Sequence, residues 1–331
     1  MFGLDVLIQK VLLLSAMVAI GFIMRKANKA DGNLAKGFGD AVIYLAQPAM
    51  IIYSFLDAQF SVKILITSIL VLVFSSIFHL LYYGIALLCF KNAPEKQQSV
   101  LHFATVFSNA GFMGIPLISE LISPVAAIYA TFYVVSFNIY NWSLGCYIYT
   151  KDKKYISLKS MFVNPATIPT YIGVALFILG GVFTIPNSLQ PIFNDFLTPI
   201  LKDDILFLLK CTVIPLSMMM IGIRLAENNC KGIFKDKYLP LVLVIRLIVL
   251  PLIVMCIMKL IILTGIIPND IIVPCATVLV ISSSTPSAAT ANIFAERFDG
   301  DAVYSSKIVS ISTILSLITM PLVAAILKYV F

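Results

Sequence analysis

Apolar runs of about 20 residues, separated by short polar segments, recur along the whole of this 331-residue chain. Hydrophobic residues make up 60% of the sequence and charged residues 12%, and the mean hydropathy is +1.00. Such runs are long enough to cross the hydrocarbon core of a bilayer as helices. Lipid offers no partner for backbone N–H and C=O groups, so the runs must satisfy them internally. The sequence therefore predicts an all-α polytopic membrane protein.

The apolar runs define ten predicted transmembrane helices. They cover residues 4–24, 36–56, 63–90, 98–120, 124–149, 165–185, 203–225, 239–263, 272–295 and 304–330. Lys and Arg gather in alternate connecting loops, which the positive-inside rule places in the cytoplasm. We therefore expect a multi-pass protein of the cytoplasmic membrane with both termini outside. The net charge of +7 is mainly this topology signal and does not indicate a nucleic-acid partner.

The polar segment 151–164 is a predicted cytoplasmic linker between two halves, residues 1–150 and 165–331, with five predicted spans each. Because five is odd, the second half must run inverted relative to the first, as in many secondary transporters. Helix-disturbing residues recur at corresponding places: Pro48 in the second span matches Pro215 in the seventh, and the fourth and ninth spans are both interrupted. Proline and glycine are common in membrane helices generally, but two matched pairs favour a transporter site.

The two interruptions have compositions that oppose a continuous helix. They read SNAGFMGIP at 108–116 and SSSTPS at 282–287. Proline removes a backbone donor and glycine lowers helix propensity, so we expect both helices to break. A half-helix that starts after a break presents unpaired N–H groups and a partial positive charge, which suit an anion. The candidate substrate-binding residues are Asn109, Gly111, Gly114, Pro116, Ser283, Ser284, Thr285, Pro286 and Ser287, with Asn138 and Asn141 of the fifth span.

These polar residues also have structural interpretations. Asn109 can cap its own broken helix, and each hydroxyl can bond to a carbonyl one turn earlier. Asn138 and Asn141 can face the site or form hydrogen bonds between neighbouring helices. The sequence alone leaves both interpretations open.

Charged and titratable groups are scarce inside the predicted spans. No Asp or Glu lies near the middle of any span, whereas a sodium/proton exchanger is expected to need such a carboxylate. Arg246 lies inside the eighth span. It has either a charge role in transport or a structural role, such as binding the freed carbonyls of a broken helix. His79 and His102 are candidates for a proton role, although a neutral buried histidine is commoner.

Four stretches together resemble the auxin efflux carrier family. They are SNAGFMGIPL at 108–117, NPATIPTYIG at 164–173, RLIVLP at 246–251 and STPSAATANIFAERF at 284–298. The family includes the plant PIN auxin exporters and bacterial permeases for malate or malonate, and the short loop between the fifth and sixth spans is similar to the bacterial branch. Asn109 and Pro116 match the family's crossing point in the fourth span, and Pro286 matches the one in the ninth.

The resemblance implies the fold of the bile-acid sodium symporters. Spans 1, 2, 6 and 7 would form a scaffold that makes a homodimer. Spans 3 to 5 with 8 to 10 would form a transport domain in which the broken fourth and ninth spans cross.

The expected function is secondary transport of a small organic anion, a carboxylate, by elevator-like movement of the transport domain. No HExxH, GxSxG or P-loop pattern occurs in the sequence, so we expect no catalysis, no cofactor and no metal site. Two alternatives stay open: a sodium-coupled symporter of the bile-acid type, and a membrane protein that senses a ligand without transporting it.

Overall fold

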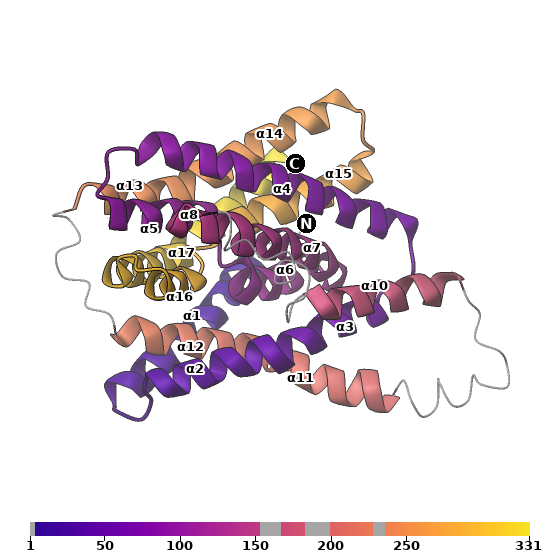
Figure 1. Ribbon diagram of the computed structural model, residues 1–331. Coiled ribbons are helices and arrows are strands. Elements are labelled where there is room, and N and C mark those ends of the chain that lie inside the picture. The colour runs from indigo at the N-terminus through magenta and orange to yellow at the C-terminus, as the bar shows by residue number, and fades with distance from the viewer. Residues whose placement is uncertain (1–3, 153–166, 183–198, 228–235) are drawn as a thin grey trace.

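The computed structural model describes residues 4–152, 167–182, 199–227 and 236–331, and the regular elements in these ranges are helices (Figure 1). In the first half they are α1 (Leu4–Lys26), α2 (Gly32–Ala41), η1 (Val42–Ala46), α3 (Gln47–Asp57), α4 (Val62–Cys89), α5 (Glu95–Val106), η2 (Ala110–Gly114), α6 (Ile115–Leu121), α7 (Pro124–Tyr140), η3 (Asn141–Gly145) and α8 (Cys146–Thr150). In the second half they are α10 (Thr167–Val182), η6 (Pro199–Leu206), α11 (Phe207–Cys211), α12 (Val213–Glu227), α13 (Tyr238–Val244), η8 (Ile245–Val249), α14 (Leu250–Thr264), α15 (Asn269–Ser284), α16 (Thr290–Arg297) and α17 (Ala302–Val330). The η segments are π-helical.

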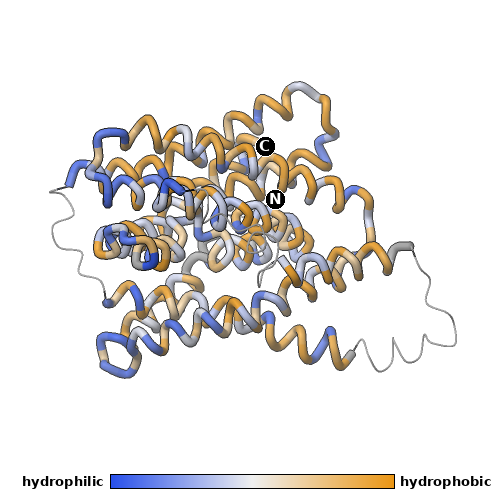
Figure 2. Tube along the Cα trace, in the orientation of Figure 1, coloured by the Kyte–Doolittle hydropathy of each residue, from blue (hydrophilic) through white to orange (hydrophobic). Residues whose placement is uncertain are grey.

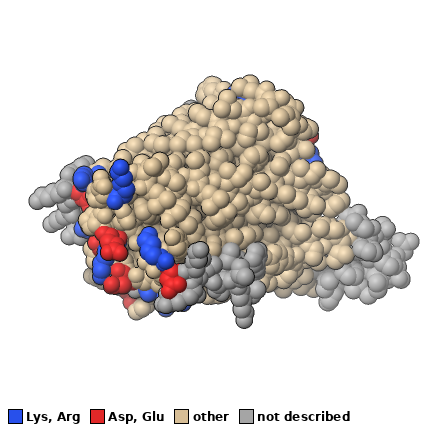
Figure 3. Space-filling model, turned by 45° about the horizontal axis from the view of Figure 1, so that its top comes forward, with Lys and Arg blue, Asp and Glu red and all other residues tan. Residues whose placement is uncertain are grey.

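Within the described residues, five helical stretches are long and apolar enough to cross a membrane. They are Gly32–Asp57, Val62–Cys89, Ile200–Glu227, Tyr238–Thr264 and Ala302–Val330. Apolar residues dominate the middle of the helices and hydrophilic ones gather near their ends (Figure 2). On the face shown in Figure 3, most of the charged side chains cluster at one end and leave a broad uncharged surface. The described part of the chain is therefore all-helical, and its apolar helices are those of a multi-pass membrane protein.

Every predicted span contains helix in the described ranges, but the count of ten crossings and the inverted repeat stay predictions. Residues 153–164 of the predicted linker lie outside the described residues.

Three π-helical segments each end two residues before a proline. The pairs are Ala46 and Pro48, Gly114 and Pro116, and Val249 and Pro251. Proline lacks an N–H group and in an α-helix leaves the carbonyl four residues earlier without a donor. A π-turn shifts the bonding to the fifth residue along, so the helix passes the proline without stopping. These three spans therefore stay helical past Pro48, Pro116 and Pro251, whereas α11 ends at Cys211, four residues before Pro215, with one turn residue between it and α12.

The helices pack in two groups. α1 and α2 both lie against α12, and α3 lies against α10 and α11. In the other group, α4 packs on α7 and α15, and α15 packs on α14 and α17. In Figure 1, α2, α3, α11 and α12 run along the lower side, and α4, α13 and α14 along the upper side.

Glycines set the closest helix contact in the first group. A Cβ atom on Gly21 would collide with the Met219 carbonyl oxygen, and one on Gly222 would collide with the Val18 carbonyl oxygen. The backbones of α1 and α12 therefore touch at a crossing that excludes any side chain at these two positions.

Candidate substrate site at the helix crossing

Two helices of the second group are broken, and the breaks lie against each other. α5 ends at Val106, followed by Phe107 in an extended conformation (φ −99°, ψ 118°). α15 ends at Ser284, followed by Thr285 (φ −66°, ψ 152°), which precedes Pro286 and is thereby biased away from helix. Ser108 and Ser287 form an antiparallel bridge. Its bonds run from Asn109 N–H to the Pro286 carbonyl (2.7 Å) and from Ala288 N–H to the Phe107 carbonyl (2.9 Å).

The position of the first break differs from the sequence prediction. The chain leaves the helix at residues 107–109 and is helical again from Ala110 to Leu121, so Gly111, Gly114 and Pro116 lie inside the second half-helix. Pro116 does not cause the break, because the π-turn before it supplies an alternative bonding register. Gly114 still lies at the crossing, where a Cβ atom on it would be 3.5 Å from the methyl carbon of Thr285.

The start of the half-helix after the first break carries free donors. Asn109 N–H and Met113 N–H are bonded, to the Pro286 and Asn109 carbonyls. Within the described part of the chain, the N–H groups of Ala110, Gly111 and Phe112 have no hydrogen-bond partner outside their helix. Three adjacent free N–H groups at a helix start, with the positive end of its dipole, form a site for negative charge.

Two buried amides face the same region. Asn109 is 5% exposed and Gln47 is 6% exposed, and neither side chain makes a hydrogen bond to a described residue. Nε2 of Gln47 would lie 3.5 Å from a Cβ atom placed on Gly111. Buried amides are normally hydrogen-bonded, so this pair is available to a ligand. Sequence reasoning missed Gln47, although an amide next to Pro48 in an apolar run was a visible signal.

The hydroxyls of the second break are already used in bonds within the protein. Ser283, Ser284 and Thr285 donate to carbonyls of their own helix, at 2.8 Å each. Ser287 donates to the Ala104 carbonyl of α5 (3.0 Å) and fastens the two broken helices together. The four hydroxyl oxygens can still accept hydrogen bonds from a ligand, but their protons are already donated to carbonyls of the protein. Ser282, which sequence reasoning did not select, has a buried hydroxyl without a partner among the described residues.

The asparagines of the fifth span do not join the crossing through hydrogen bonds among the described residues. Asn138 donates to the Val134 carbonyl of its own helix (3.0 Å). Asn141 begins the π-helical segment η3, is 2% exposed, and has an Oδ1 atom without a partner. Their direct contact with substrate stays a prediction.

Arg246 is fully buried at the opposite side of the crossing. Its guanidinium donates to the Thr105 carbonyl (3.1 Å), which belongs to the end of α5. It also donates to the Ser283 and Thr285 carbonyls (2.9 and 3.2 Å) at the end of α15. Of the two roles expected from the sequence, the bonding to freed carbonyls is the one that these contacts show. The arginine lies in the π-helical segment η8, in which Ile245, Arg246 and Leu247 are all buried.

The two histidines are buried, and the ring of His79 lies 6.0 Å from the ring of Phe107 at the first break. Nδ1 of His79 is 2.6 Å from the Ser75 carbonyl oxygen and must carry the proton, which leaves Nε2 as an unpartnered acceptor. Its ring stacks on Tyr140 at 5.4 Å. His102 has no hydrogen bond on either ring nitrogen within the described residues and meets Tyr83 edge to face at 6.1 Å. A second proton on either ring would place an unpaired charge in an apolar setting, which is costly.

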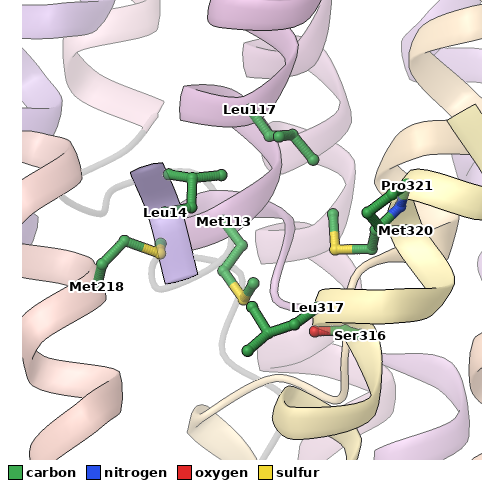
Figure 4. Close-up of a pocket in the computed structure, with 8 residues that line it drawn as sticks. All are labelled: Leu14, Met113, Leu117, Met218, Ser316, Leu317, Met320 and Pro321. Carbon is green, nitrogen blue, oxygen red and sulfur yellow. The ribbon is translucent and has the colours of Figure 1, made fainter. Parts of the chain in front are cut away.

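A small apolar pocket lies between the two groups of helices, beside the second half-helix (Figure 4). Side chains from α1, η2, α6, α12 and α17 converge on it: Leu14, Met113, Leu117, Met218, Ser316, Leu317, Met320 and Pro321. A neighbouring pocket shares Leu14 and Leu117 and reaches Pro116 and Glu120. The pockets therefore trace the boundary between α1 and α12 on one side and the half-helix on the other.

Crossing broken helices with free donors, inside an all-helical apolar chain, define a membrane transport protein. The chain belongs to the membrane transport protein family, which is the auxin efflux carrier family, and the family's sequence profile matches residues 6–162 and 154–324. The two matched segments meet around the predicted linker. No curated protein matches the chain as a relative.

Proposed function

We propose that the protein is a secondary transporter of a small organic anion that carries a carboxylate group. The observation that carries this proposal is the set of free N–H groups at Ala110, Gly111 and Phe112, next to the unpartnered amides of Asn109 and Gln47. A carboxylate is acceptor-only and matches such an all-donor arrangement. Bonds of this kind, with one charged partner, are about twice as strong as neutral ones.

Charge at the crossing supports an anionic substrate. The start of the half-helix at Ala110 and that of α16 at Thr290 each carry roughly half an elementary positive charge. Together they can meet one carboxylate without a basic side chain. The ends of α5 and α15 carry the opposite partial charge, which the guanidinium of Arg246 already meets.

The packing supports alternating access between two rigid groups. The free donors lie in the group built on α4, α7 and α15, whereas Gln47 lies on α3 in the group with α10, α11 and α12. In an elevator-like cycle, the group built on α4, α7 and α15 slides along the group of α3, α10, α11 and α12 and carries the anion with it. The apolar pocket between the two groups lies where this cycle requires a sliding boundary. We propose that the group of α1, α2, α3, α10, α11 and α12, as the scaffold, makes a homodimer.

The test is flux of radiolabelled mono- and dicarboxylates in proteoliposomes for the wild type and for Asn109→Ala. Asn109→Ala should lower saturable transport by at least about tenfold, the loss of one hydrogen bond to a charged group, with unchanged size-exclusion profile and melting temperature. Near-normal flux would remove Asn109 from the site. A requirement for sodium would favour the bile-acid type of symporter, and tight binding without any turnover would favour a sensor.

A further inference from the structure

The carbonyl ends of broken helices in transporters are places where Na⁺ or H⁺ is bound, because they gather oxygen atoms and partial negative charge. In this chain the corresponding place is taken by a side chain. Arg246 is 0% exposed, and three of its nitrogens each bond a carbonyl oxygen from the end of α5 or α15. Its guanidinium carbon also lies 5.9 Å from the ring centre of Tyr82.

The charge balance around Arg246 is complete without a carboxylate. A buried arginine normally needs an acidic partner, and Arg246 forms no salt bridge with a described residue. The two helix ends that it touches supply roughly half a negative charge each, which sums to about one. A positive ion bound there in addition would leave an excess charge in a buried place, which is strongly unfavourable.

We infer that Arg246 is a built-in cation that replaces a coupling ion at the crossing. Its planar fork holds the ends of both broken helices together, and it moves with them, since η8 packs on α15. Transport of the anion therefore needs no Na⁺ or other metal cation at this place. This inference rests on the proposed function for its transport consequence, but its structural part stands without a substrate.

The first experiment uses chemical rescue of Arg246→Ala, which leaves a space shaped for free guanidinium. We expect a lower melting temperature in detergent and about tenfold or more loss of carboxylate flux in proteoliposomes. Millimolar guanidinium chloride should restore a large part of both, whereas equal concentrations of sodium or choline chloride should not. Lys259→Ala is the matched control, because Lys259 lies farther along the same span and bonds the Val330 carbonyl. Guanidinium should leave this control unchanged.

Arg246→Lys keeps the charge but loses the fork, and it covers the case in which Arg246→Ala does not fold. We expect a melting temperature and flux between those of the wild type and the alanine variant, still without a sodium requirement. A lysine variant that depends on sodium, or an alanine variant that equals the wild type, would overturn the inference.

Ion replacement in the wild type separates this inference from the proposed function. Carboxylate flux should be unchanged when choline replaces sodium on both sides of the membrane. Carboxylate flux that requires sodium would overturn the built-in cation but leave carboxylate transport standing. Absence of any carboxylate flux would overturn the proposed function, and the melting-temperature rescue would still decide the role of Arg246.

Discussion

At the scale of single residues, the two sides of the crossing have opposite chemistry. The free N–H groups of Ala110, Gly111 and Phe112 lie at a helix start, and the guanidinium of Arg246 closes two helix ends. Side-chain hydroxyls contribute less than their number suggests, because most of them donate to nearby carbonyls. The amides of Asn109 and Gln47, the Ser282 hydroxyl and Oδ1 of Asn141 are buried and make no hydrogen bond to a described residue.

Gln47→Leu tests the amide on α3. Because it removes one hydrogen bond to a charged ligand, worth ~1.5–3 kcal/mol, we expect KM for the carboxylate to rise about 10- to 100-fold. The melting temperature should stay within a few degrees. Ser54→Ala on the same helix is the control, since its hydroxyl already bonds the Met50 carbonyl and should not affect KM. Equal KM values for Gln47→Leu and the wild type would exclude Gln47 from the site.

The sequence predicted part of this site for clear physical reasons. Asn109 and the break near Pro286 follow from residues that oppose a helix, and the structure has both in contact. Gln47 was missed because its position next to Gly111 depends on how α3 packs against η2, which the sequence does not show. The bonding of Arg246 to two different helices likewise depends on tertiary contacts that lie 37 to 141 positions apart in the sequence.

At the scale of helices, proline has two different effects in this chain. Pro286 fixes the break of α15, because Thr285 before it is extended. Pro48, Pro116 and Pro251 each follow a π-turn and leave their helices continuous. Local sequence does not distinguish these outcomes. The predicted break of the fourth span is present, but it lies at residues 107–109 and does not extend over the whole stretch 108–116.

The close contact of α1 and α12 gives a test at this scale. Gly222→Leu forces the two backbones apart at the Val18 carbonyl, so we expect a loss of about 1–3 kcal/mol in the free energy of unfolding. The lower thermal unfolding midpoint should be visible in detergent. Gly84→Leu on α4 is the matched control, because a Cβ atom there meets nothing within 4 Å. If both variants unfold at the same temperature as the wild type, the glycine contact does not stabilise the packing of α1 on α12.

At the scale of the whole molecule, the helices divide into two packed groups with an apolar pocket between them. Met113 of η2 and Met218 of α12 approach this pocket from the two sides (Figure 4). Flexible methionine side chains suit a boundary where two surfaces change their contacts. The free donors and Arg246 all lie on the same side of this boundary.

Cross-linking across the boundary tests the movement. In a background without the six native cysteines, a short bifunctional thiol reagent on Met113→Cys with Met218→Cys should stop flux almost completely, and reduction of a cleavable linker should restore it. Lys63→Cys with Asp270→Cys is the control pair within one group, where the native side chains are 2.7 Å apart. Cross-linking the control pair should leave flux near normal. Full flux with Met113→Cys and Met218→Cys linked would contradict relative movement of the two groups.

The most direct test of the central claim compares each transported carboxylate with its uncharged amide in the same proteoliposomes. Free N–H groups at a helix start select for negative charge, so the carboxylate should be transported and should compete for uptake. The amide of nearly equal size should do neither at equal concentration. Transport or competition by the amide as strong as by the carboxylate would show that the crossing does not recognise an anion.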